Sequence, residues 1–217
     1  MSDFALARKT MVDNQLRTSA ITDRRLLGAM GEVPREKFVP ATRQGLAYID
    51  EAQPISATRK LSPPAPFARL VQLAAVEGTD RVLDLGCGTG YSAAVLGQLA
   101  AQVVAVEDDA ALATSARQVL AELGATNVSV VEGPLDRAGE AQGPYDVIVV
   151  EGTVAEVPPG LFDQLTPEGR LVASIGASGK VPVAHLFAKS GKGIAARADF
   201  DARLPPLATV RDDSFVF

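Results

Sequence analysis

The chain has 217 residues, of which 47% are hydrophobic and 22% are charged, and its formal net charge at pH 7 is −5. This composition is typical of an ordinary folded protein, and the length suffices for one well-buried α/β domain with an extension. The negative charge argues against a broad nucleic-acid-binding face, one cysteine excludes an internal disulfide, and one histidine beside it argues against a zinc site.

The location of the protein is predicted from two further features. No apolar run approaches the length of a membrane span, and the first residues lack the charged start and apolar core of a signal peptide. We therefore expect a cytoplasmic protein without a membrane partner. No heptad pattern indicates a coiled coil, and the chain is expected to be a monomer.

The N-terminal third predicts helices followed by an irregular region. Apolar residues interleaved with charges predict a helix over residues 4–17, and Thr22-Asp23 offers a cap for a second helix that ends near Gly31. Six prolines between residues 34 and 66 indicate a long irregular stretch, after which residues 66–76 are expected to be helical. We treat residues 1–66 as an extension and 67–217 as the core of a single domain.

The remainder predicts a Rossmann-like α/β fold with a mostly parallel, twisted sheet and a C-terminal antiparallel hairpin. Strands are expected near 81–85, 102–107, 127–131, 145–151 and 169–175, alternating with helices near 90–100, 109–123 and 158–165. Residues 182–188 and 194–201 predict the hairpin. Alternation in its second strand predicts one buried and one solvent-exposed face.

The segment 81–96 carries the clearest functional signal. A strand ending in Asp84 is followed by Gly86, Gly88 and Gly90 and then by a helical run. Strand, glycine turn and helix together make a nucleotide-type pocket. A carboxylate at the strand end repels a pyrophosphate but suits a cationic ligand, such as the amino acid part of S-adenosylmethionine. The segment therefore predicts a methyltransferase.

An NAD-binding protein is the competing interpretation, because residues 88–93 also satisfy the loose G-x-G-x-x-A pattern. Both classes expect an acid about twenty residues on for the ribose hydroxyls, and Glu107 at the end of the second strand supplies it. Glu107 supports an adenosine ligand without choosing between the two classes. Asp84 favours the methyltransferase.

Over essentially its whole length the chain resembles the protein-L-isoaspartate O-methyltransferases. The most specific segments are Met11-Val12-Asp13-Asn14-Gln15-Leu16, Val33-Pro34-Arg35-Glu36-Lys37-Phe38-Val39-Pro40, the glycine motif through Leu96, Pro144-Tyr145-Asp146-Val147-Ile148-Val149-Val150 and Gln164-Leu165-Thr166-Pro167-Glu168-Gly169-Arg170. The resemblance implies S-adenosylmethionine as cofactor. It also implies, as the substrate, the free carboxylate of isoaspartyl residues in damaged proteins, whose methylation begins repair.

The resemblance also assigns residues to the site. It implies that Ser62 holds the substrate and acts as the catalytic residue, and that no metal takes part. The cofactor would be bound by residues of the covering loop, the glycine motif, the end of the second strand and the turn after the third: Leu61, Asp84, Gly86, Gly88, Gly90, Glu107, Asp108 and Gly133. A carboxylate acceptor is already ionised near pH 7 and needs no general base. His185 and Cys87 are accordingly interpreted as structural.

Two departures from the family pattern concern substrate and cofactor. In the loop where the family carries Thr-Ile-Ser-x-Pro-His, this chain has Lys60 in place of the threonine and Ala65 in place of the histidine. Arg59 and Lys60 could attract a carboxylate or simply be solvated. Where the family has Gly-Asp-Gly, with an acid for the adenine amino group, Pro134 replaces the acid, and Asp136 is a possible substitute.

Three functions stay open at this point. The first is an isoaspartyl carboxyl methyltransferase with a modified substrate loop. The second is a methyltransferase of the same fold that acts on another carboxylate or a hydroxyl group. The third is a non-catalytic relative that serves as a binding or regulatory protein.

Overall fold

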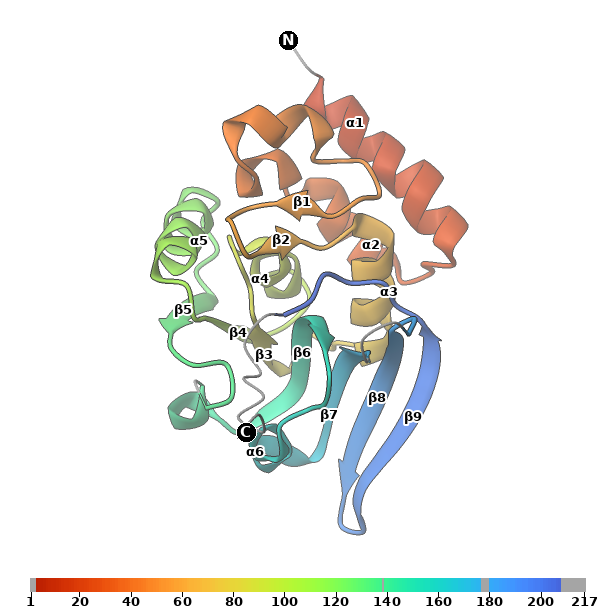
Figure 1. Ribbon diagram of the computed structural model, residues 1–217, viewed down its shortest axis with the longest axis vertical. Helices are drawn as coiled ribbons and strands as arrows, with labels where there is room; N and C mark the ends of the chain where they lie inside the picture. The colour runs from red at the N-terminus through yellow and green to blue at the C-terminus, as the bar shows by residue number, and fades with distance from the viewer. Residues whose placement is uncertain (1–2, 138, 177–179, 208–217) are drawn as a thin grey trace, which may run out of the picture.

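The computed structural model describes residues 3–137, 139–176 and 180–207. Its centre is a seven-stranded sheet with strand order β5-β4-β3-β6-β7-β8-β9, shown in Figure 1. The strands are β3 (Arg81–Leu85), β4 (Gln102–Glu107), β5 (Val128–Glu132), β6 (Tyr145–Val154), β7 (Leu165–Ile175), β8 (Val183–Ser190) and β9 (Gly193–Asp201). Pairing is parallel from β5 to β7, whereas β8 and β9 are antiparallel, which confirms the predicted fold.

Helices pack on the sheet as expected for a doubly wound fold. They are α3 (Pro64–Ala74), α4 (Tyr91–Gly97), α5 (Ala110–Glu122) and α6 (Pro159–Asp163). Alternate residues of the strands face different cores: Val82 of β3 packs with α3, α4 and α5, whereas Leu83 and Leu85 pack with Leu161 of α6. The sheet is therefore buried on both faces around β3, the strand that carries Asp84.

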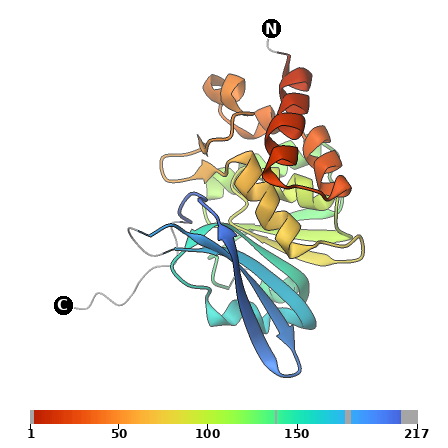
Figure 2. The ribbon, with the colours of Figure 1, turned by 90° about the vertical axis from the view of Figure 1, so that its right-hand side faces the viewer.

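The N-terminal segment forms a helical layer at one end of the molecule, visible at the top of Figures 1 and 2. It contains α1 (Phe4–Met11), which continues as a π-helix over Val12–Leu16 and a 3-10 turn over Arg17–Ser19, then α2 (Arg24–Glu32) and 3-10 helices at Arg35–Phe38 and Ala41–Leu46. The short strands β1 (Gln53–Pro54) and β2 (Lys60–Leu61) lie between this layer and the core. The first helix was predicted without its change of pitch, and β1 and β2 were not predicted.

Helix α2 begins where the sequence indicates, because the Asp23 carboxylate accepts hydrogen bonds from Arg25 N and Leu26 N. It ends at Glu32, between Gly31 and Pro34, which agrees with the expected end near Gly31. Helix α3 starts at Pro64, two residues earlier than expected, since proline is accepted in the first turn.

The C-terminal hairpin projects from the body of the molecule in both views. The prediction of one buried face on β9 is wrong: apart from Phe200, its residues are exposed. β9 is the edge of the sheet, and the part of the structure that is described places no helix over its outer half. No helix among the described residues is long and apolar enough to cross a membrane.

Candidate functional site

The three glycines after β3 form a close-fitting turn at the carboxyl end of the strand. Gly86, Gly88 and Gly90 have φ angles of 84°, 58° and 93°, which other residues rarely adopt. A Cβ on Gly86 would lie 2.6 Å from Leu207 Cδ1, and one on Gly88 would lie 2.7 Å from Ile55 Cδ1. The sequence thus uses glycine where backbone shape and close approach both require it.

Asp84 lies directly below this turn and is fully buried. The Ser92 hydroxyl, from the first turn of α4, donates to Asp84 Oδ2 over 2.7 Å. Asp84 Oδ1 is buried and has no hydrogen-bond partner among the described residues. Burial raises the pKa of this carboxyl group to about 7. One acceptor atom is therefore held ready for a donor that the described chain does not supply.

Glu107, at the end of β4, faces the same turn and accepts four hydrogen bonds. Its Oε1 accepts from Asp108 N at 3.1 Å and Asp109 N at 3.2 Å. Its Oε2 accepts from Gly88 N at 2.6 Å and Arg59 Nη2 at 3.0 Å. Burial raises its pKa to about 7, although Arg59 acts in the opposite direction. A carboxylate offers about four lone-pair positions, so all of those on Glu107 are in use.

Arg59 comes from the segment between β1 and β2, and its side chain reaches into this site. This segment, together with both strands and Ser62, is the covering loop (residues 53–62). The Arg59 guanidinium also donates to the Gly86 carbonyl and to Asp108 Oδ1, each over 3.0 Å, and only 6% of the residue is exposed. The interpretation of Arg59 as a solvated residue is therefore wrong, and the carboxylates that it contacts in the structure are those of Glu107 and Asp108. Its neighbour Lys60 is exposed as expected.

A cavity of about 810 Å³ lies on the adenine side expected from the sequence, lined by Leu85 and Asp108 next to the two acids but not by Asp84 or Glu107 themselves. Asp108, Gly133, Pro134 and Asp136 line it, together with Leu207. Gly133 N donates to the Glu107 carbonyl, which holds the turn against β4. Asp136 lies at the cavity as predicted, but it forms an exposed ion pair with Arg137 at 3.6 Å.

Ser62 lies in the loop that leads from β2 into α3 and is buried. The fully buried Arg35 fixes this loop, donating from Nη2 to the Ser62 carbonyl at 2.5 Å and from Nε to the Ala47 carbonyl at 2.6 Å. The Arg35 guanidinium also lies 4.6 Å from the centre of the Tyr91 ring. Leu61, predicted at the cofactor, packs into the hydrophobic core and lines neither cavity described here.

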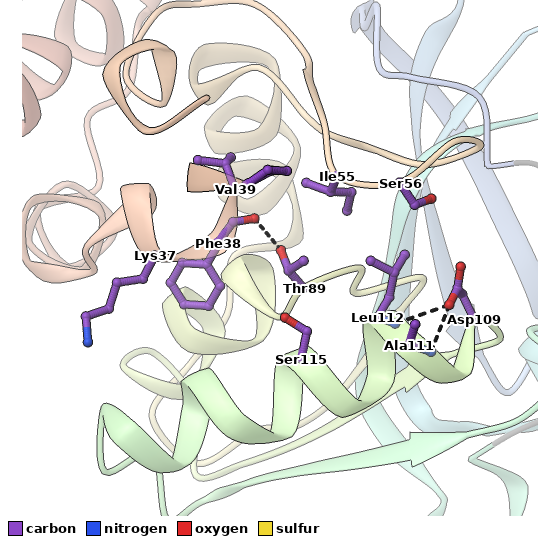
Figure 3. A pocket seen from close by; sticks show the side chains of 11 residues that line it. Lys37, Phe38, Val39, Ile55, Ser56, Thr89, Asp109, Ala111, Leu112 and Ser115 are labelled. Atoms are coloured by element: carbon purple, nitrogen blue, oxygen red, sulfur yellow. Dashed lines mark hydrogen bonds between the residues drawn. The ribbon is translucent and has the colours of Figure 1, made fainter. Parts of the chain in front are cut away.

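A second hollow of about 300 Å³ lies above α5, as Figure 3 shows. Phe38, Ile55, Thr89 and Leu112 line it, and the Thr89 hydroxyl donates to the Phe38 carbonyl over 2.6 Å. This contact ties the glycine turn to the N-terminal layer. The hollow borders the loop between β1 and β2, because Ile55 and Ser56 of that loop line it.

The surroundings of Cys87 and His185 are consistent with their interpretation as structural residues. Burial raises the pKa of the Cys87 thiol well above its usual value, which disfavours a thiolate. His185 Nδ1 lies 2.9 Å from the Val183 carbonyl in the hairpin. Within the described ranges, no cluster of three or more histidine, cysteine or acidic side chains is arranged to hold a metal ion.

Sequence reasoning gave Arg35 and Glu151 no role at the site and did not foresee the contact of Arg59 with Glu107. Arg35 stands in the segment that carried the family resemblance, so its place there could have flagged it. Arg59 and Glu151 belong to no motif, and their contacts depend on the path of a loop and on the pairing of β6 with β3.

The site combines a doubly wound sheet, an acid before the glycine turn and a second acid at the end of the next strand. These features define a nucleotide-cofactor protein of the Rossmann-like methyltransferase class. Comparisons with known proteins agree. Residues 6–208 match the family model described as Protein-L-isoaspartate(D-aspartate) O-methyltransferase (PCMT). The chain belongs to this family.

Individual relatives are similar over most of their length. The chain is 45% identical to the protein-L-isoaspartate O-methyltransferase of Koribacter versatilis over 82% of its own residues and 80% of the relative's. It is 39% identical to the enzyme of the same name from Methanoculleus marisnigri, covering 85% and 84% of the two chains.

Two solved structures share the fold. One, a protein-L-isoaspartate O-methyltransferase, is 27% identical with a TM-score of 0.81, and the match covers 92% of this chain and 65% of that one. The other is a Plasmodium falciparum protein described as a putative member of the family in complex with S-adenosyl-L-homocysteine. It is 22% identical with a TM-score of 0.77, and the match covers 92% and 97% of the two chains.

Proposed function

We propose that this protein transfers a methyl group from S-adenosylmethionine to the free carboxylate of L-isoaspartyl residues in damaged proteins. The observation that carries this proposal is the arrangement of Asp84, the glycine turn and Glu107, which Arg59 of the covering loop contacts. Family membership supports the choice of cofactor and acceptor. The cofactor would supply a methyl group already activated by a sulfonium centre.

The residues present fit that cofactor. The unpartnered Oδ1 of Asp84 is suited to the cationic amino group of the methionine part. Glu107 is suited to ribose hydroxyls, provided that Arg59 releases it. The side chains of Leu207 and Ile55 lie against the glycine turn, and Asp108 and Gly133 border the cavity on the adenine side. Leu61 would contribute only through packing of the covering loop.

The protein's contribution to catalysis is alignment and exclusion of water. A carboxylate acceptor is ionised near pH 7, so no residue has to remove a proton from it. Ser62 would orient the acceptor, and Arg35 would keep the Ser62 loop in place through its bond to the loop carbonyl. Asp84, Glu107 and Arg59 are shielded from solvent, which strengthens their electrostatic interactions with a bound ligand.

A methyltransferase that acts on another carboxylate or on a hydroxyl group is the second candidate. It is favoured by the exposed Lys60 and by Ala65, which is buried and offers no polar group to an isoaspartyl acceptor. We further propose a single-domain, monomeric, cytoplasmic protein. A continuous core that joins the N-terminal layer to the sheet supports the single domain, and the net charge of −5 argues against a nucleic-acid partner.

Calorimetric titration with S-adenosylmethionine and S-adenosylhomocysteine, followed by assay with an isoaspartyl peptide, tests the proposal. We expect micromolar cofactor binding and methyl ester formation. Binding without turnover would favour the second candidate, and absence of binding would favour a non-catalytic role. Ser62→Ala should slow methyl transfer at unchanged cofactor affinity, whereas Ser190→Ala, in the exposed hairpin, should change neither.

A further inference from the structure

Glu151 extends from β6 next to the glycine turn. Leu85 pairs with Val150, so Glu151 lies at the level of Gly86 on the neighbouring strand. Side chains alternate along a strand, and Ile148 and Val150 face the core around α6. Glu151 therefore lies on the opposite face, together with Val149 and Asp84, below the N-terminal layer and the Ser62 loop.

Three charged groups, each from a different element, act electrostatically on this side chain. The pKa of Glu151 responds to Asp84 on β3, to Arg35 in the N-terminal layer and to Arg59 in the covering loop, while Cys87 and Tyr91 respond in turn to Glu151. Glu151 Oε1 and Asp84 Oδ1 are buried acceptor atoms without partners among the described residues, whereas the Arg35 guanidinium lies against the Tyr91 ring. Buried polar atoms normally have partners, so this concentration indicates a ligand-binding centre.

We propose that Glu151 contacts the methyl acceptor and, as a neutral carboxyl group, donates a hydrogen bond to the acceptor carboxylate. This proposal rests on the function proposed above and names a specificity residue for the same site. A carboxylate ion here would repel an anionic acceptor, whereas a neutral carboxyl group offers an O–H donor. Hydrogen bonds from such a donor to an ionised oxygen are short and strong.

The electrostatics of the site favour the neutral form. Burial raises the pKa of Glu151 well above its usual value, and the nearby Asp84 raises it further. Arg35 and Arg59 act in the opposite direction. Arg59 also pairs with Glu107 and Asp108, so part of its charge is already balanced.

The chemical step balances without proton transfer. One oxygen of the acceptor carboxylate accepts the hydrogen bond from Glu151, and the other forms the new bond to the methyl carbon. The bond between that carbon and sulfur breaks, and its electron pair stays on sulfur, so the negative acceptor and the positive sulfonium are both neutralised. The proton remains on Glu151, which can still donate to the ester carbonyl.

Two variants of Glu151 separate its possible roles. Glu151→Gln keeps a neutral donor and should retain kcat/KM for an isoaspartyl peptide within about threefold at pH 7. Glu151→Ala removes the donor and should raise KM by about tenfold or more. The dissociation constant of S-adenosylhomocysteine should change less than twofold in both variants. Glu168→Gln, at an exposed position of β7, is the matched control.

The pH profile is the readout that a purely structural role would not move. Ionisation of Asp84, whose pKa is about 7, should raise kcat/KM as pH rises, while ionisation of Glu151 should lower it again. The wild type should therefore show a bell-shaped profile, and Glu151→Gln should keep only the rising limb.

Loss of turnover in Glu151→Gln with intact cofactor binding would overturn the proposal, because it would show that an ionised carboxylate is needed. An unchanged KM in Glu151→Ala would also overturn it. If the wild type binds cofactor but does not methylate the peptide, the proposed function fails instead. NMR titration of the Glu151 carboxyl carbon then decides separately: an ionised group at pH 7 overturns the donor role, and a neutral one retains it for another anionic acceptor.

Discussion

Arg59 Nη2 lies 3.0 Å from Glu107 Oε2 and supplies the fourth hydrogen bond to that carboxylate. The other three come from backbone N–H groups of Gly88, Asp108 and Asp109. Only the arginine can leave without unfolding a turn. Ribose hydroxyls that bind Glu107 must therefore displace Arg59, and the covering loop that carries it.

Arg59→Met should accordingly tighten binding of S-adenosylhomocysteine by about tenfold. In the wild type the ligand has to break the charge-assisted hydrogen bond between Arg59 and Glu107, whereas in the variant this bond is absent. Without the guanidinium the pKa of Glu107 should rise, so the gain should be larger at pH 9 than at pH 7. Calorimetry at both pH values measures this. Arg24→Met, on the exposed side of α2, should leave affinity unchanged. Weaker binding in Arg59→Met would show that the arginine supports the cofactor rather than competing with it.

Asp84 should couple stability to pH. Because burial raises its pKa to about 7, above the value near 4 of an unfolded chain, the folded protein holds a proton between these values that the unfolded chain releases. Its contribution to the free energy of unfolding therefore falls as pH rises from about 4 to about 7.

Asp84→Asn removes this dependence and should be more stable than the wild type by about 2 kcal/mol at pH 8, with little difference at pH 4. The same variant should lose cofactor binding. Urea unfolding of the wild type and the variant at several pH values measures this difference. Lys9 and Lys37 lower the pKa values of Asp13 and Glu122, but these residues contribute equally to both proteins, so their contributions cancel. Equal stability across the range would contradict the assignment.

Arg35 should contribute to the free energy of unfolding chiefly through the two backbone carbonyls to which it donates hydrogen bonds. Arg35→Met leaves the carbonyls of Ala47 and Ser62 buried without their donor and should lower the free energy of unfolding by about 3 kcal/mol. Arg35→Lys should recover part of this. Urea unfolding measures the loss, and a change of less than about 0.5 kcal/mol, typical of a surface site, would exclude the role.

Pro134 should limit cofactor affinity. Pro134→Asp places a carboxylate on the rim of the cavity of about 810 Å³ and should tighten S-adenosylhomocysteine binding by about tenfold, since Asp136 is engaged with Arg137. Pro134→Ala is the control, because it removes the proline ring without adding a hydrogen-bond acceptor. If alanine tightens binding equally, the backbone and not the carboxylate is responsible.

The sequence predicts the core of this fold well because its periodic pattern is local. Strands β3 and β4 begin and end at the expected residues, and the acid of each lies at the glycine turn. The long-range path of the loop from Gln53 to Ser62 has no such pattern. Neither its pairing as β1 and β2 nor the insertion of Arg59 could be predicted, since both depend on contacts with residues distant in sequence.

Errors in the prediction have physical causes. Alternation in β9 suggested a buried face, but an edge strand is covered on that face only where a helix reaches it, near Phe200. Glu151 stands at the last position of the expected strand, but no motif marks it, and its place beside Gly86 depends on the pairing of β6 with β3. The placement of Leu61 at the cofactor came from the resemblance and stays a prediction, and its side chain packs into the hydrophobic core.

The segment from Leu204 to Leu207 completes the cleft from the far end of the chain. Thr153 N donates to the Pro205 carbonyl, Leu207 N donates to the Thr153 carbonyl, and the Leu207 side chain covers Gly86. During synthesis, β3 and the glycine turn leave the ribosome long before this segment does. A growing chain can form its sheet while the wall of the cleft is still missing, so the ability to bind a cofactor should arise only after Leu207 has been synthesised.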